Sequence, residues 1–248
     1  MSEADAARRA EIAANLETVR ARIAGACAAA GRSAAEVNLV AVTKFRPASD
    51  ALHLFALGQR LFGENRDQEA AAKSAEVAAV LSAVPRDQWP EWHFIGQLQT
   101  NKAKSVVSYA DAVESVDRVE LVAALAKAAE RSGRRPRCFV QVNLDPRAVR
   151  ESGGRGGAHP DEILQVADAV ADSGALRLEG LMAVAPLDAP PEPAFERLAA
   201  LAAKLRGVHP DAVSLSAGMS GDLEAAVAVG ATHVRIGSAL LGGRPPLR

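Results

Sequence analysis

The chain has 248 residues, 49% of them hydrophobic, and its 29 basic and 30 acidic residues leave a formal net charge of −1. This balance gives no electrostatic reason to expect nucleic acid or an anionic membrane surface as a partner. No apolar run reaches the ~20 residues of a membrane span, and residues 1–22 lack the apolar core of a signal peptide. We therefore expect a cytoplasmic protein.

Apolar residues recur at helical spacing near the N-terminus. Ile12, Leu16, Val19 and Ile23 follow one another at steps of four, three and four, so they share one face of a helix. Gly31 follows and suits the end of a helix. The pattern predicts a helix ahead of the first strand.

Eight short apolar segments follow, and each is typical of a β-strand. They are residues 37–43, 60–62, 92–95, 112–116, 137–143, 178–184, 213–215 and 233–236. Amphipathic helical stretches lie between them, including residues 119–131, 161–172 and 195–205.

Nearly continuous apolar strands that alternate with helices predict a parallel sheet buried on both faces. Eight such units, in a length close to the roughly 250 residues of a (β/α)8 barrel, can close on themselves. We predict an α/β fold, a single (β/α)8 TIM barrel domain over residues 1–248 with an extra N-terminal helix. An open, doubly wound sheet is the structural alternative.

The first predicted strand is followed by Lys44. TIM barrels place their chemistry at the C-terminal face, where the βα-loops gather. Lys44 is therefore the first functional candidate, although a lysine at a strand end is also an ordinary surface residue.

Two glycine-containing turns near the C-terminus suit a phosphate group. Residues 216–222 include Ser220 and join a short strand to a helix, and residues 235–238 contain the end of the last predicted strand and the turn after it. Backbone N–H groups in such turns can bind an oxyanion, and the loops after strands seven and eight often form the phosphate site of a TIM barrel. Alternatively, the glycines only make tight turns, and Ser220 and Asp222 only cap a helix.

Residues 152–158, with the sequence SGGRGGA, lack the spacing and the lysine of a P-loop. We interpret them as a mobile βα-loop at the barrel mouth. Cys27 and Cys138 have neither metal nor redox spacing, which indicates buried reduced thiols. The five histidines are scattered without metal spacing, so we predict no metal.

A lysine and a phosphate pocket in one barrel mouth suggest a phosphorylated aldehyde, because an amine can hold a carbonyl as a Schiff base. Pyridoxal 5′-phosphate (PLP) fits both halves of such a site. A phosphorylated sugar handled by a Schiff-base aldolase fits them as well.

Six motifs in fixed order make the pattern specific. They are AVTK (41–44), FGEN (62–65), WHFIGQLQTNK (92–102), GLM (180–182), GMSGD (218–222) and VRIGS (234–238). Over about residues 10–243 the chain closely resembles the pyridoxal phosphate homeostasis protein family. The resemblance implies a PLP-binding barrel related to the N-terminal domain of alanine racemase, with PLP as cofactor and a role in intracellular PLP (vitamin B6) homeostasis.

The resemblance also implies a role for each site residue. Lys44 would carry the Schiff base, and Arg235 would face the pyridine nitrogen. The phosphate would be held by Ser220, Gly237 and Ser238, with Asn65 and His93 lining the same mouth.

The chain departs from the family pattern at Phe45, Ala217, Arg147 and Arg150. A small polar residue is common at the first of these positions, methionine at the second, and a glutamate and lysine pattern around the last two. These departures concern loop contacts and leave the cofactor positions intact.

A charged arginine beside the pyridine nitrogen disfavours protonation of that nitrogen, so the ring is a weaker electron sink. A racemase also needs an acid-base residue opposite Lys44. The single tyrosine, Tyr109, precedes the fourth predicted strand and so lies toward the opposite end of the barrel.

We therefore predict a PLP carrier and regulator with no catalytic residue and no robust catalysis. Further partners would be PLP-dependent apo-enzymes and free amino acids, and we expect a monomer. The alternatives are a PLP-dependent amino-acid racemase, or a related enzyme acting at the α-carbon, and the sugar-phosphate aldolase.

Overall fold

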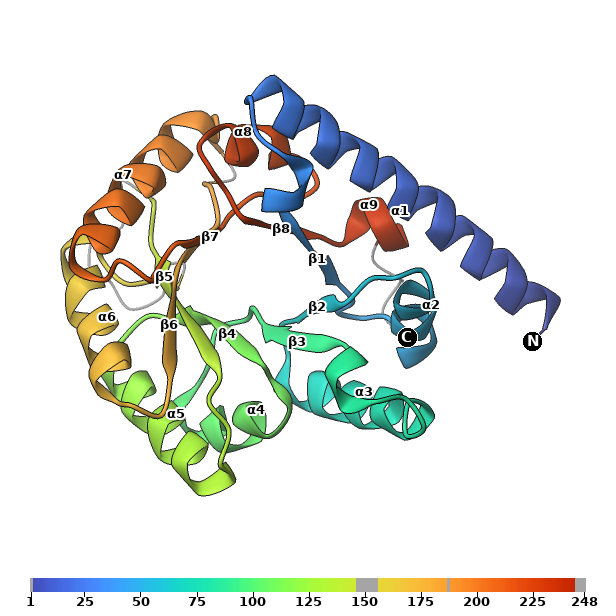
Figure 1. Cartoon of the computed structure of the whole chain (residues 1–248), viewed down its shortest axis with the longest axis horizontal. Helices are drawn as coiled ribbons and strands as arrows, with labels where there is room; N and C mark the ends of the chain where they lie inside the picture. The colour runs from blue at the N-terminus through green and yellow to red at the C-terminus, as the bar shows by residue number, and fades with distance from the viewer. Residues whose placement is uncertain (1, 146–155, 187, 244–248) are drawn as a thin grey trace.

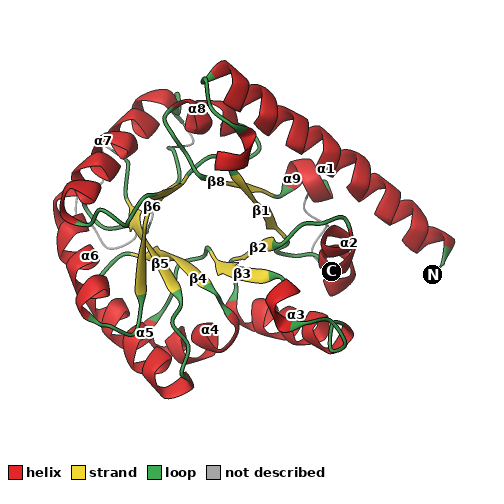
Figure 2. Ribbon diagram, viewed as in Figure 1, coloured by secondary structure: helices red, strands yellow, loops and turns green. Residues whose placement is uncertain are grey.

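The computed structural model describes residues 2–145, 156–186 and 188–243. In these residues eight parallel strands form a closed barrel in chain order, and helices surround it (Figures 1 and 2). The predicted TIM barrel with an extra N-terminal helix is confirmed, and the open sheet is excluded because β8 pairs with β1. The strands are β1 (Asn38–Val42), β2 (Leu61–Glu64), β3 (Glu91–Phe94), β4 (Ala112–Val116), β5 (Arg137–Val142), β6 (Arg177–Ala183), β7 (Ser214–Ser216) and β8 (His233–Ile236).

Each predicted strand coincides with one of these, and its ends differ by no more than two residues. The second strand differs most, since it continues through Gly63 to Glu64. Neither residue favours strands by itself. The ladder carries the strand on, because Gly63 pairs with Val42 of β1 and Glu64 with Phe94 of β3.

The helices around the barrel complete the βα units. They are α1 (Glu3–Ala29), α2 (Ala48–Ala56), α3 (Asp67–Val80), α4 (Ala103–Tyr109), α5 (Val119–Ser132), α6 (Ile163–Asp172), α7 (Glu192–Val208), α8 (Leu223–Ala228) and α9 (Ser238–Leu241). Within the described part of the chain, no helix is both long and apolar enough to cross a membrane.

Helix α1 buries the predicted apolar face of Ile12, Leu16, Val19 and Ile23. It lies across the short helices α8 and α9 on the outside of the barrel (Figure 1). Because α8 and α9 have only six and four residues, they cover little of the barrel there, and α1 completes the helical layer.

Two glycines of the α1 region test how backbone conformation affects stability. A Cβ atom at Gly25, inside α1, or at Gly31, just after it, would meet no atom within 4 Å. Gly31, however, has a left-handed φ of 66°. We expect Gly25→Ala to stabilise the protein by about 0.5 to 1 kcal/mol and Gly31→Ala to destabilise it by about 1 kcal/mol. Urea unfolding of the two variants measures both effects, and a shift of the same sign in both would contradict this account.

The apolar core lies mainly between the strands and the helices, where Cys27 and Cys138 are also buried as free thiols. Inside the barrel the apolar cluster is small and consists of Ala112, Phe139 and Met182, with Val184 packed against it. Several buried polar side chains also come from the strands, among them His93, Glu114, Ser216, His233 and Arg235. Since buried polar groups in a barrel interior are costly unless paired, their arrangement points to the site.

Candidate functional site

Lys44 lies at the barrel mouth, two residues beyond the end of β1, and its side chain is exposed. Val40 and Val42 lie on one face of β1. Those two valines contact the position that a Cβ at Gly63 would take, as does Ile95. The exposed Lys44 side chain therefore lies just beyond the end of β1, where a ligand can reach it.

A buried ion cluster under α3 fixes the backbone next to Lys44. The Lys73 ammonium lies 2.7 Å from the Thr43 carbonyl oxygen, 2.6 Å from Glu64 Oε1 and 3.0 Å from Glu69 Oε1. The Thr43 hydroxyl donates to Glu64 Oε1 at 2.6 Å. Burial raises the pKa of Glu64, and the nearby Lys73 partly offsets this effect. The cluster holds the turn that presents Lys44.

Phe45, on the other side of Lys44, has a left-handed φ of 63°, which is strained for a bulky side chain. Its N–H donates to Glu69 Oε1 at 2.5 Å, and the Arg66 guanidinium lies 4.9 Å from the centre of its ring. Phe45, where the chain departs from the family pattern, is thus accommodated by contacts with Glu69 of α3 and with Arg66, which precedes α3.

The two predicted phosphate turns lie side by side. The Ser238 hydroxyl donates to Ser220 Oγ at 3.1 Å, and the Ala239 N–H donates to the same oxygen at 3.4 Å. A Cβ at Gly237 would lie 3.2 Å from the Val42 carbonyl oxygen, so this turn packs against the end of β1. Hydroxyl groups from two turns are therefore gathered next to the strand that leads to Lys44.

The turn after β7 is braced from both sides. Gly218 has a φ of 91°, and a Cβ there would lie only 2.7 Å from that of Ala226. The Asp222 side chain accepts from the Met219 N–H at 2.5 Å and makes no side-chain cap on α8. From α1, Arg22 donates to the Ser220 carbonyl oxygen at 3.1 Å. The extra helix thus supports the predicted phosphate turn directly.

Asn65 follows β2 at the mouth. Among the described residues, its Oδ1 is buried and has no hydrogen-bond partner, an unsatisfied acceptor of the kind that a ligand can complete. A hollow of about 480 Å³ opens beside it, lined in part by Asp67, Phe94, Gln97 and Lys102. That volume is within the range of small-molecule sites.

The predicted glycine-rich loop lies largely outside the described residues, as do Arg147 and Arg150. Its last residues lie at the mouth, where Ala158 bridges to Val142 of β5. Gln141 donates to the Gly156 carbonyl oxygen at 2.8 Å. This end of the loop is therefore paired with a barrel strand.

Inside the barrel, a chain of hydrogen bonds connects opposite walls. His93 Nδ1 lies 2.6 Å from Glu114 Oε1, and the Ser216 hydroxyl donates to Glu114 Oε2 at 2.6 Å. Arg235 donates to Ser216 Oγ at 2.6 Å and to the Ala183 carbonyl oxygen at 2.8 Å. Side chains of β3, β4, β7 and β8 are thereby joined.

Burial opposes the ionisation of Arg235 and of Glu114, the arginine and the carboxylate of this hydrogen-bond network. It lowers the pKa of Arg235, although Glu114 and Asp222 oppose the shift. Burial alone would raise the pKa of Glu114, but His93, Arg235 and Ser216 together lower it to about 2. The interior therefore holds a carboxylate near a guanidinium, with Arg235 and Glu114 3.8 Å apart.

The His93 side chain is fully buried within this hydrogen-bond network. It therefore contacts Glu114 rather than open space at the mouth. Direct contact between His93 and a cofactor stays a prediction, as do the roles of the other predicted site residues. Sequence reasoning missed Glu114 and Ser216. The available signal was a charged glutamate within the short strand AVESV, whose three other apolar positions predict burial, because an unpaired charge is rarely buried.

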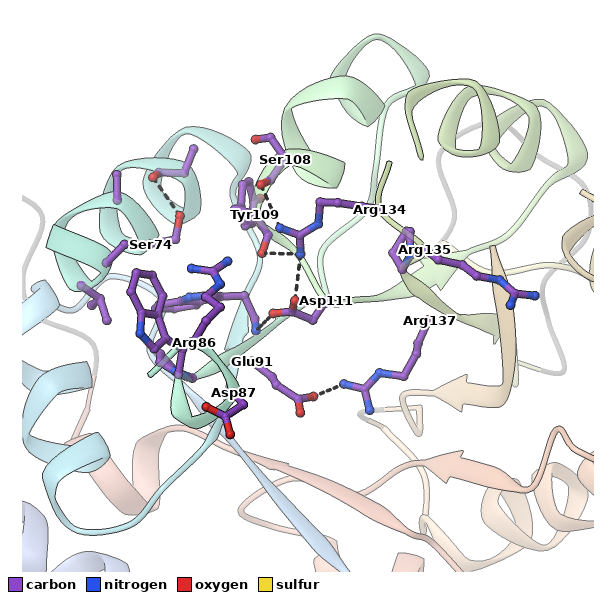
Figure 3. Close-up of a pocket in the computed structure, with 18 of the residues that line it drawn as sticks. Ser74, Arg86, Asp87, Glu91, Ser108, Tyr109, Asp111, Arg134, Arg135 and Arg137 are labelled. Atoms are coloured by element: carbon purple, nitrogen blue, oxygen red, sulfur yellow. Dashed lines mark hydrogen bonds and ion pairs between the residues drawn. The ribbon is translucent and has the colours of Figure 1, made fainter. Parts of the chain in front are cut away.

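A second hollow, of about 900 Å³, lies at the N-terminal face of the barrel (Figure 3). There the Arg134 guanidinium donates hydrogen bonds to three backbone carbonyl oxygens at the end of α4, those of Ser108, Tyr109 and Ala110. It also pairs with Asp111 at 2.8 Å. Glu91 pairs with Arg137, whose guanidinium lies 3.5 Å from His93 Nε2.

Tyr109 lines this N-terminal hollow, at the end of α4 (Figure 3). Its hydroxyl lies 3.5 Å from Asp67 Oδ1 of α3, in the helical layer outside the barrel. Burial raises the pKa of Tyr109. The chain's tyrosine therefore does not enter the interior that Arg235 and Glu114 share.

The fold and the mouth define a barrel of the alanine racemase N-terminal domain class, and the family described as "Alanine racemase, N-terminal domain" matches residues 8–245. The pyridoxal phosphate homeostasis protein of Mycobacterium tuberculosis (strain H37Rv) is 43% identical over 245 residues, 96% of this chain and 94% of that protein. The chain belongs to the pyridoxal phosphate homeostasis protein family.

Two solved structures have the same fold. The crystal structure of an unknown protein from Bifidobacterium adolescentis has a TM-score of 0.85 and 30% identity, and covers 97% of both chains. The structure of PipY from Synechococcus elongatus with PLP bound has a TM-score of 0.77 and 34% identity, over 93% of this chain and all of that one.

Proposed function

We propose that this protein binds PLP as a Schiff base on Lys44 and takes part in PLP homeostasis without robust catalysis. The observation that carries the proposal is the packing of the Ser220 and Ser238 turns against the end of β1, next to Lys44. The similarity to PipY, whose structure holds PLP, and to relatives named for PLP homeostasis supports the same cofactor.

The residues present at the mouth fit PLP. Two hydroxyls and the turn at Gly237 offer a cradle for the phosphate, and the unsatisfied Asn65 Oδ1 offers a further polar contact. Bound PLP supplies an aldehyde that an amine can hold reversibly and a ring that can withdraw electrons. Lys44 is the amine exposed at the strand end, and Arg235 would donate to the ring nitrogen from the barrel interior.

An amino-acid racemase remains the competing function. It needs an acid-base group on the face of the substrate opposite Lys44. Tyr109 lies outside the barrel, which favours the carrier over the enzyme. A turnover assay over a panel of amino acids with PLP-loaded protein tests this directly: racemisation or another α-carbon reaction at a typical enzyme rate would overturn the carrier assignment.

As parts of the same proposal, the chain acts as one cytoplasmic domain and as a monomer, and passes PLP to PLP-dependent apo-enzymes or exchanges it with free amino acids. The first test is an absorption spectrum of protein mixed with PLP, before and after borohydride reduction, followed by mass mapping. The expected result is a reducible chromophore on the peptide that contains Lys44. A protein that takes up no PLP would overturn the proposal and favour the sugar-phosphate barrel.

Ser220→Ala tests the phosphate turn. Its hydroxyl lies between Ser238 and the Ala239 N–H, so removing it takes away a partner for each. We expect PLP affinity to fall by about 1 to 3 kcal/mol, the usual cost of an unsatisfied polar group. Equilibrium titration monitored by absorbance measures the change, with Ser82→Ala, at an exposed position after α3, as the control. An unchanged dissociation constant would count against this phosphate site.

A further inference from the structure

The hydrogen bonds of the barrel interior have one consistent direction. Arg235 can only donate, so Ser216 Oγ accepts from it, and the serine hydroxyl then donates to Glu114 Oε2. Glu114 Oε1 accepts from His93 Nδ1–H, which leaves His93 Nε2 as an acceptor toward Arg137. One arrangement of protons thus satisfies every member of the chain.

The charges of Arg235 and Glu114 also indicate that these two residues act as a pair. Arg235 is 4% exposed and Glu114 is fully buried, so neither side chain is compensated by bulk water. A buried guanidinium without a nearby carboxylate is strongly destabilised. Glu114 lies 3.8 Å from Arg235, and the serine hydroxyl joins the two groups.

We infer that Glu114 is a positioning residue of the proposed PLP site: through Ser216 it holds the Arg235 guanidinium in one orientation and balances its charge. The inference rests on the proposed function, in which Arg235 meets the pyridine nitrogen. Glu114 itself does not touch PLP. Its role is to fix the donor that does, because a guanidinium with a fixed orientation loses less freedom when it forms the next hydrogen bond.

Glu114 also changes the electrostatic effect that Arg235 would have on the pyridine nitrogen of PLP. In the proposed site the ring nitrogen would meet an ion pair rather than an isolated positive charge. The carboxylate reduces the positive potential that the guanidinium would otherwise impose on the ring. Removing the charge of Glu114 should therefore alter the spectrum of bound PLP as well as its affinity.

Glu114→Gln tests this with a side chain of nearly the same shape. The amide lacks the charge and cannot accept from both His93 and Ser216 with its two terminal atoms. We expect PLP to bind at least tenfold more weakly and the absorption maximum of the bound chromophore to shift. The matched control is Glu11→Gln, which removes a carboxylate from an exposed pair with Arg8. It should leave both readouts unchanged.

A double-mutant cycle separates positioning from a general effect on the fold. If Glu114 acts through Arg235, then Glu114→Gln in an Arg235→Gln background should change PLP affinity less than twofold. Equal effects of Glu114→Gln in both backgrounds would overturn the inference. So would a wild-type affinity and spectrum in the single variant.

Ser216→Ala provides a second route if Glu114→Gln does not fold. It keeps the carboxylate and removes the hydroxyl that joins it to Arg235, so the same weakening and spectral shift are expected, and wild-type values overturn the inference. Failure of the wild-type protein to take up PLP would instead overturn the proposed function. The two failures are thus distinguishable.

Discussion

Replacing Lys44 by alanine is expected to reduce borohydride-trapped PLP to background while the protein stays folded. Only a side-chain amine can hold the aldehyde covalently, and Lys44 is the amine at the end of β1, next to the turns of Ser220 and Ser238. Because the Lys44 side chain is exposed, its loss should change the free energy of unfolding by no more than about 0.5 kcal/mol.

The matched control is Lys102→Ala. Lys102 is another lysine at the mouth; it is half-exposed and lies 3.8 Å from Asp67. Trapping should persist in this variant, and mass mapping should still locate the label on the peptide of Lys44. Undiminished trapping in Lys44→Ala, with the label on another lysine, would contradict the assignment.

Replacing Lys73 by methionine is expected to destabilise the protein by about 3 to 5 kcal/mol, the cost of leaving one member of a buried ion pair without its partner. Lys73 is 4% exposed and binds Glu64, Glu69 and the Thr43 carbonyl oxygen. Urea unfolding measures the loss. Because the cluster holds the backbone next to Lys44, borohydride trapping should also be slower in this variant.

The loss of stability in Lys73→Met should depend on pH because of Glu64. Burial raises its pKa in the folded state above the unfolded value, so ionised Glu64 opposes folding, and this cost disappears as the pH falls through the raised pKa. Without Lys73 the pKa should rise further. The destabilisation of Lys73→Met should therefore be larger at about pH 8 than at about pH 5.

A second substitution provides the check. In Lys73→Met combined with Glu64→Gln, the buried charge is removed together with its partner, so part of the lost stability should return. A single variant as stable as the wild-type protein, or a loss that does not depend on pH, would show that the cluster carries little stabilisation.

The barrel itself could be predicted from local patterns. The strands are apolar runs separated by amphipathic helices, and that alternation specifies parallel strands buried on both faces whatever the details of packing. The largest difference at a predicted strand end is in β2, where the two added residues are poor strand formers. Gly63 and Glu64 extend β2 only because β1 and β3 are there to pair with them.

The mouth was predicted in part. Lys44, Ser220 and Ser238 each come shortly after a barrel strand, and residues beyond the carboxyl ends of parallel strands meet at one face. The sequence therefore determined which chemical groups the mouth contains. It did not determine that α1, through Arg22, braces the Ser220 turn, since those two segments lie at opposite ends of the chain.

The barrel interior was decided by tertiary structure. Glu114 and Ser216 are separated by 102 positions, and their pairing depends on how the closed sheet brings β4 opposite β7. Likewise, the sequence around Lys73 predicts an exposed polar residue of an amphipathic helix. In the structure Lys73 is buried against Glu64 and Thr43. Local sequence specifies strands, helices and turns because they depend on near neighbours. Buried charges find their partners across the fold, so only the closed barrel decides which of them are paired.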